Sequence, residues 1–150
     1  MKTSKLIEKI SGPASKAWIV GDKAFDMIDR GIDVIHLGIG DPDFDTPSHI
    51  IASLEKALSS GKTHYSPLLG ETELREEIAI HAKKLYGGHI SKDNVAVLPG
   101  AQAALFSSFL CIAENDDEVI ALEPTYATYP AVIKGSGAKL ITVKLNRNEK

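Results

Sequence analysis

The stretch from Asn94 to Gln102, Asn-Val-Ala-Val-Leu-Pro-Gly-Ala-Gln, is the part of the chain from which the fold is best predicted. Val95–Leu98 is a short continuous apolar run, typical of a strand that is buried on both faces. Pro99 and Gly100 end this run, and Ala101–Ala113 then reads as a helix. A sharp strand-to-helix turn leaves the first N–H groups of the helix unpaired, and they form a seat for an anion, commonly a phosphate. The alternative is that this turn is only a connection, since it is neither a G-x-G-x-x-G fingerprint nor a P-loop.

The chain that follows alternates between strand and helix. We predict strands at Val119–Leu122 and Leu140–Val143 and a helix at about Ala127–Lys134. This alternation indicates parallel strands joined by crossovers, and therefore an α/β domain. The helix Ala101–Ala113 is apolar almost all round, which predicts burial between the sheet and another layer.

Two turns should meet in one crevice, because ligands of parallel sheets bind beyond the carboxyl ends of the strands. The turn Gly100–Gln102 follows the first predicted strand, and Glu123–Tyr126 follows the next. If these strands are neighbours, the ring of Tyr126 lies beside the anion seat. Such a site suits a planar heterocycle that bears a phosphate.

The first half of the chain is predicted to be mainly helical. The segment from Gly38 to Pro47 is rich in turn-forming residues and is the most plausible domain boundary, and Gly61–Gly70 reads as an irregular loop. Apolar periodicity and end signals predict a brief strand at Val34–Leu37 and helices at Leu6–Ile10, Ala17–Asp29, Pro47–Ser59 and Glu71–Tyr86.

Composition narrows the class of protein. The chain has 150 residues, enough for one ordinary domain with a substantial core, and a formal net charge of −3, which gives no nucleic-acid signature. The single cysteine, Cys111, excludes an internal disulfide. No signal peptide and no membrane-spanning run is recognised. We therefore expect a soluble cytoplasmic protein.

A metal site is not expected. Asp41, Asp43 and Asp45 could bind a hard cation, but their alternation with Pro42 and Phe44 fits a tight turn better. The five histidines show no spacing typical of metal ligands.

Several separate motifs occur along the chain: Gly40–Pro47, Tyr65-Ser66-Pro67 with Gly70, Glu73-Leu74-Arg75, Gly100–Ala104, Asp117–Ile120 and Pro124-Thr125-Tyr126. Together they resemble one family, the class I pyridoxal-phosphate-dependent aminotransferases of fold type I, which include aspartate aminotransferases. Within it, Ala17-Trp18, Thr63-His64-Tyr65, Gly100-Ala101-Gln102 and Glu123-Pro124 are most similar to the arginine–pyruvate transaminase branch.

The resemblance implies a domain plan and a cofactor site. Residues 1–45 would be an N-terminal arm and small-domain segment, and residues 46–150 the first part of a large domain, a mostly parallel sheet with helices on both faces. Gly100, Ala101 and Gln102 match the turn that binds pyridoxal 5'-phosphate, with the backbone N–H groups of Ala101 and Gln102 on its phosphate. Tyr126 matches the aromatic residue that stacks on the pyridine ring, where many relatives have tryptophan.

Three further residues receive roles from the resemblance. Tyr65 matches a tyrosine that reaches from the neighbouring subunit of a homodimer to the cofactor phosphate. Gly40 matches a glycine whose backbone contacts the substrate α-carboxylate. Trp18 falls near an apolar position that closes over the substrate, although a tryptophan is more often a core anchor.

The implied function is transfer of an amino group from an L-amino acid to a 2-oxo acid. The family's Schiff-base lysine, its pyridine-binding aspartate and its carboxylate-binding arginine lie further along a longer chain. Lys134 and Lys139 flank a Gly-Ser-Gly turn and read as solvated residues. We therefore expect no catalytic residue among these 150, which would be an N-terminal portion that is inactive alone.

Two other classes of protein remain open on sequence alone. Val34–Asp41 loosely suggests the glycine-rich turn of a nucleotide- or S-adenosylmethionine-binding domain, although Pro42 and Pro47 interrupt the helix that should follow. A non-catalytic binding module that keeps the phosphate seat is the other alternative.

Overall fold

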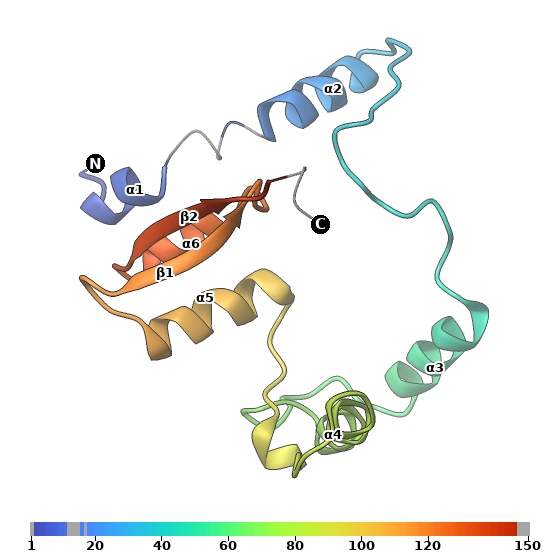
Figure 1. Ribbon diagram of the computed structural model, residues 1–150. Coiled ribbons are helices and arrows are strands. Elements are labelled where there is room, and N and C mark those ends of the chain that lie inside the picture. Colours follow the sequence, from blue (N-terminus) through green and yellow to red (C-terminus); the bar gives the residue numbers. More distant parts are fainter. Residues whose placement is uncertain (1, 12–15, 17, 147–150) are drawn as a thin grey trace. The chain divides into compact units, whose positions relative to one another are not determined.

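The computed structural model describes residues 2–11, 16 and 18–146. These residues form two compact units, which we call the first and the second unit. The first contains the described residues up to Gly40 and those from Gly100 onward, and the second is Asp41–Pro99. In chain order the elements are α1 (Lys5–Ile10), α2 (Ile19–Asp29), α3 (Ser48–Ser59), α4 (Thr72–Tyr86), the 3₁₀ turn η2 (Lys92–Asn94), α5 (Ala101–Ile112), β1 (Glu118–Glu123), α6 (Tyr129–Gly135) and β2 (Lys139–Lys144), as labelled in Figure 1 apart from η2.

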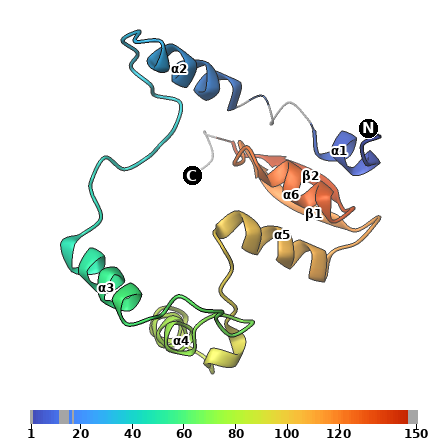
Figure 2. The same cartoon turned by 180° about the vertical axis from the view of Figure 1, so that it is seen from behind.

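The first unit has a parallel two-stranded sheet. Strands β1 and β2 pair from Glu118 opposite Lys139 to Glu123 opposite Lys144. Helix α6 connects them and lies against one face of the sheet (Figures 1 and 2). The predicted parallel α/β arrangement is therefore confirmed in this unit, with each strand one residue longer at both ends than expected.

Helix α6 is the centre of packing in the first unit. It contacts α1, α5 and β2, and its Ile133 is only 2% exposed. Ala138, in the turn after α6, is also buried. Helix α1 matches the short helix predicted at Leu6–Ile10, and the side chain of Ser4 accepts a hydrogen bond from the N–H of Leu6 at its start. Burial of α6 thus holds the sheet, α5 and α1 together.

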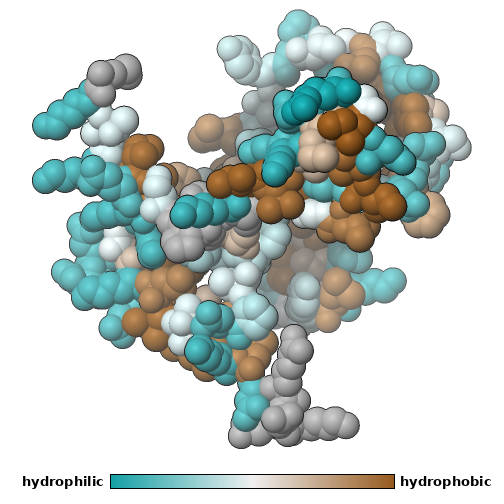
Figure 3. Space-filling model, turned by 90° about the horizontal axis from the view of Figure 1, so that it is seen from above, coloured by the Kyte–Doolittle hydropathy of each residue, from teal (hydrophilic) through white to brown (hydrophobic). Residues whose placement is uncertain are grey.

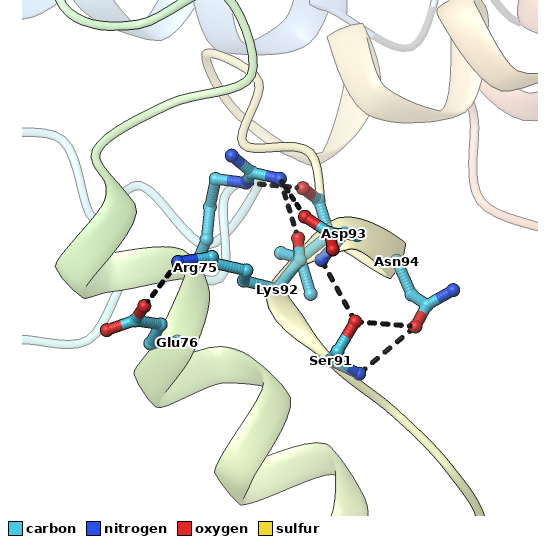
Figure 4. A network of polar contacts seen from close by, with 7 residues as sticks. Arg75, Glu76, Ser91, Lys92, Asp93 and Asn94 are labelled. Atoms are coloured by element: carbon cyan, nitrogen blue, oxygen red, sulfur yellow. Dashed lines mark hydrogen bonds and ion pairs between the residues drawn. The ribbon is translucent and has the colours of Figure 1, made fainter.

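The second unit is organised around Arg75 in the first turn of α4. Arg75 is buried, with 9% of the residue exposed. Its guanidinium donates from Nε to the carbonyl of Val95 at 2.8 Å and from Nη2 to the carbonyl of Lys92 at 2.7 Å (Figure 4). The ammonium of Lys92 in turn pairs with Glu76 at 2.7 Å. Helix α4 is therefore tied to η2 and to the segment that leads toward Gly100.

Two predicted strands are not strands in the structure. Val95–Leu98 is irregular backbone that leads into the turn at Gly100. The N–H of Val97 donates to the carbonyl of Leu69 at 2.9 Å and the N–H of Val95 to the carbonyl of Lys92 at 3.1 Å, and neither bond belongs to a ladder. Val34–Leu37 likewise has no ladder partner among the described residues. An apolar run predicts a buried strand, but a strand also needs a neighbour to complete its hydrogen bonds.

The described residues have only a small apolar core, although the length of the chain would allow a larger one. Their buried apolar residues are Ala24, Ala79, Ile133 and Ala138, and many large apolar side chains are open to solvent (Figure 3). Helix α5, predicted to lie between two layers, has no buried residue. A sheet of two strands offers too little surface to cover these side chains.

The other helices lie close to their predicted positions. Helix α2 begins at Ile19, with Trp18 as its N-cap, and ends at Asp29 as predicted; Ala17 lies outside the described residues. Helix α3 begins at Ser48 because Pro47 occupies its N-cap position rather than its first turn. Helix α4 ends at Tyr86 before Gly87, as the glycine pair predicts. No helix in the described ranges is long and apolar enough to cross a bilayer.

Candidate functional site

The turn into α5 has the geometry of an anion seat. Gly100 is the N-cap with φ +89° and ψ 157°, and no atom lies within 4 Å of the point where a Cβ would stand. The first bond of the helix runs from the N–H of Ala104 to the carbonyl of Gly100 at 3.2 Å. In the described part of the chain, the N–H groups of Ala101, Gln102 and Ala103 have no hydrogen-bond acceptor. They are therefore available to an anion that approaches over Gly100.

The side chain of Gln102 connects this seat to the turn after β1. The hydroxyl of Thr128 donates to Oε1 of Gln102 at 2.7 Å, in a partly buried position. The sequence predicts that the two turns meet in one crevice if the strands before them are neighbours. The structure joins them without a strand at Val95–Leu98, by this side-chain hydrogen bond and by packing of α5 on α6.

Tyr126 presents an aromatic ring in the same turn. The ring is about half exposed, at 52%, and the ring of Tyr129 meets it edge-on with centroids 5.7 Å apart and an interplanar angle of 61°. An edge-on neighbour fixes the orientation of a ring without covering it, as a face-to-face neighbour would. A ring so held, close in sequence to Thr128, suits stacking on a flat ligand whose phosphate occupies the seat at α5. The residues present therefore fit a cofactor that has both parts.

The other predicted site residues are not joined to this turn by any hydrogen bond or ring contact among the described residues. Trp18, just before α2, is 44% exposed, and Gly40 is exposed with open space around it. Tyr65 lies in the second unit, in the loop before α4, and its side chain is fully exposed. The roles of these three residues remain predictions.

Thr128 is the residue that sequence reasoning missed. It stands at the N-cap position of α6, where threonine is common for reasons unrelated to function. Its position two residues after Tyr126 was the one sign in the sequence that it lies near the site. The hydrogen bond to Gln102 could not be predicted, because a contact between side chains far apart in sequence leaves no periodic pattern.

An apolar cavity lies beside the turn after β1 in the first unit. It has a volume of about 500 Å³ and is lined by residues of α5, β1 and α6, including Leu105, Phe109 and Ile133, with no charged side chain. None of Gly100, Ala101, Gln102 and Tyr126 lines it. Its lining carries no positive charge for a phosphate, so the candidate site is the α5 turn and not this cavity.

No metal centre is formed by the part of the chain that the structure describes: no three His, Cys, Asp or Glu side chains lie close enough to hold an ion. Of the two lysines considered in the sequence, Lys139 forms an exposed ion pair with Asp116 at 3.0 Å. Lys134 lies near the end of α6 with its side chain exposed.

Comparison with known proteins gives the family. A family profile described as "Aminotransferase class I and II" matches residues 32–150. The chain belongs to this family, whose aspartate aminotransferase members are enzymes that depend on pyridoxal phosphate. The match includes the anion seat and Tyr126, and it also includes the whole Val34–Asp41 turn, so the nucleotide-binding alternative is not favoured.

Individual relatives agree. The chain is 36% identical over 143 residues to the arginine–pyruvate transaminase AruH of Pseudomonas aeruginosa, covering 95% of this chain and 36% of that protein. It is 43% identical over 116 residues to a probable aspartate aminotransferase of Methanocaldococcus jannaschii, covering 77% of this chain and 31% of that protein. The solved aspartate aminotransferase of Thermus thermophilus with maleate matches with a TM-score of 0.90 and 32% identity, over 99% of this chain and 38% of that one. The chain thus spans about a third of the length of these relatives, and its fold is that of the corresponding part of fold-type-I aminotransferases.

Proposed function

We propose that this protein is a pyridoxal-phosphate-dependent aminotransferase that moves an amino group from an L-amino acid to a 2-oxo acid. The observation that carries the proposal is the pair of turns joined by Gln102 and Thr128, within a chain of the aminotransferase family. One turn offers unpaired N–H groups to a phosphate, and the other offers a ring to a flat heterocycle. Because the chain spans only part of its relatives, the activity is proposed for the whole protein.

The residues of this chain would bind and orient rather than transfer protons. The N–H groups of Ala101 and Gln102 would hold the cofactor phosphate, with Gly100 allowing its close approach, and Tyr126 would stack on the pyridine ring. When bound, pyridoxal phosphate supplies the electron sink for loss of the substrate α-proton and the carrier for the amino group. The backbone of Gly40 would contact the substrate α-carboxylate. Trp18 would close over the substrate.

We place the first part of the large domain at residues 46–150, after an N-terminal arm and small-domain segment at residues 1–45. The single cysteine is compatible with a reducing compartment, and we propose the cytoplasm. Both assignments rest on the sequence and on the family.

The proposed activity is tested with the protein expressed from its full reading frame. The purified protein is titrated with pyridoxal phosphate, and its visible absorbance is followed as L-arginine or L-aspartate and then a 2-oxo acid are added. We expect an absorbance band that an amino acid removes and that a 2-oxo acid restores. Binding of the cofactor without any response to amino acids would favour the non-catalytic binding module instead.

We further propose a homodimer in which Tyr65 reaches the cofactor phosphate of the partner subunit. The full exposure of its side chain supports this, because a tyrosine committed to its own unit would be covered. The loop that carries it is held to its own unit, since the carbonyl of Leu69 accepts the N–H of Val97 at 2.9 Å. Tyr65 would then project from an anchored loop.

Hybrid dimers test whether Tyr65 acts across subunits. Tyr65→Phe and Ala101→Pro each damage both sites of a homodimer, but a hybrid of the two variants has one intact site if Tyr65 acts on the partner. Hybrid dimers isolated from the co-expressed mixture should therefore recover half of the wild-type cofactor-binding sites at limiting cofactor. A hybrid that recovers none would show that Tyr65 acts within its own subunit, and Tyr86→Phe on α4 serves as the control.

A further inference from the structure

Thr128 stands where a threonine usually caps a helix, but it does not cap α6. The hydroxyl makes no cap hydrogen bond, and the start of the helix is held by the backbone carbonyl of Thr128, which accepts from Ala131 at 3.1 Å and from Val132 at 3.0 Å. The hydroxyl donates to Oε1 of Gln102 on α5 instead, at 2.7 Å. The role of this side chain therefore lies between the two helices and not within α6.

The bond connects the two halves of the proposed cofactor site. Gln102 contributes its backbone N–H to the anion seat, and Tyr126 precedes Thr128 in the same turn. With its Oε1 engaged by Thr128, the Gln102 side chain cannot rotate freely, and the first turn of α5 is fixed against the turn that carries the ring. This bond, together with the packing of α5 on α6, thus sets the separation between the phosphate seat and the stacking ring.

We propose that Thr128 is a positioning residue that, through Gln102, fixes this separation and so makes the site selective for a ligand that carries a ring and a phosphate together. The inference rests on the proposed function. A rigid pair of subsites binds a two-part ligand more tightly than its fragments, because the second contact forms without further loss of freedom. If the two subsites are no longer held at a fixed separation, each still binds its own fragment, the ring or the phosphate, as before. The two-part ligand is then no longer bound more tightly than its fragments.

The test compares three ligands on the full-length protein: pyridoxal phosphate, pyridoxal and inorganic phosphate. For Thr128→Ala we expect the affinity for pyridoxal phosphate to fall about 2- to 10-fold, the range that one net hydrogen bond supplies. The affinities for pyridoxal and for phosphate should stay unchanged. Thr128→Ser, which keeps the hydroxyl, should bind all three ligands like the wild type.

A second variant separates positioning from simple loss of structure. Gln102→Leu keeps the backbone N–H but removes the acceptor, so it should match Thr128→Ala, and the double variant should be no weaker than either single one. Thr142→Ala on β2 is the matched control, since Thr142 is exposed and its side chain makes no hydrogen bond among the described residues.

Three results would overturn the inference: unchanged binding of pyridoxal phosphate by Thr128→Ala, an equal loss for all three ligands, or additive losses in the double variant. Each leaves the proposed function standing if the wild-type protein binds the cofactor. Failure of the wild-type protein to bind pyridoxal phosphate contradicts the proposed function itself, and the inference with it.

Discussion

The guanidinium of Arg75 and the carbonyl of Val95 are joined by a hydrogen bond of 2.8 Å, and the same side chain also serves the carbonyl of Lys92. Both acceptors belong to backbone that precedes the turn at Gly100. The nearby carboxylate of Asp93 lies 3.9 Å away and is 82% exposed, so it contributes little to holding Arg75. A buried arginine with two carbonyl acceptors is therefore the main polar support of the second unit.

Replacing Arg75 should destabilise the protein strongly. We expect Arg75→Ala to lower the free energy of unfolding by about 2–4 kcal/mol, because two partly buried carbonyls lose a charged donor. Arg75→Lys should recover only part of this, since a single ammonium does not reproduce the planar fork. Chemical denaturation of the full-length protein measures both. Arg30→Ala, which breaks an exposed pair with Asp26 on α2, is the control, and losses of similar size in the two alanine variants would refute the assigned role.

Gly70 is predicted to be intolerant of a side chain. It has φ +100°, and a Cβ there would stand 2.8 Å from Cβ of Val97, at the point where the loop after Tyr65 meets the segment before Gly100. We expect Gly70→Ala to lower the free energy of unfolding by about 2–3 kcal/mol, from backbone strain together with the clash. Gly61→Ala, with φ +83° and no atom within 4 Å, should cost only the strain, about 1 kcal/mol. Equal losses in denaturation experiments would show that the contact with Val97 is unimportant.

Tyr126→Ala should weaken ring binding without affecting phosphate binding. Loss of stacking corresponds to about 0.5–1.5 kcal/mol, so pyridoxal phosphate and pyridoxal should both bind roughly 2- to 10-fold more weakly. Inorganic phosphate should bind as before, and Tyr126→Trp should retain the affinity for both ring ligands. Tyr86→Ala, on an 81% exposed residue of α4, is the control for loss of a tyrosine. Unaltered titration curves for Tyr126→Ala would exclude Tyr126 as the stacking residue.

The sequence predicted the elements whose signal is local. The sequence predicts helix α4 because its apolar residues recur on one face and Gly87 follows it. It predicts the β1–α6–β2 unit because strand and helix patterns alternate. The strand at Val95–Leu98 was not found because its apolar run reports what the side chains prefer, whereas a strand depends on a partner. The residues of the segment do not show whether such a partner is present.

The candidate site likewise has a part that the sequence predicts and a part that it does not. The anion seat at Gly100–Gln102 and the ring of Tyr126 were predicted because both follow from local chemistry, a helix start and an aromatic residue in a turn. The bond from Thr128 to Gln102 was not predicted, since it depends on the packing of α5 against α6. Arg75 was recognised only as part of a motif, because its acceptors are backbone carbonyls, which any residue type provides.

The central claim is that the N–H groups at the start of α5 bind the phosphate of a cofactor, and Ala101→Pro tests it most directly. Proline suits the first position of a helix, and the extended ψ of Gly100, 157°, suits a residue that precedes proline, so the fold should be kept while one donor is lost. Ala101→Ser keeps the N–H and is the control. In titrations of the full-length protein, Ala101→Pro should bind pyridoxal phosphate about 10-fold or more weakly than Ala101→Ser and pyridoxal equally well. Equal affinity of the two variants for pyridoxal phosphate would contradict the account.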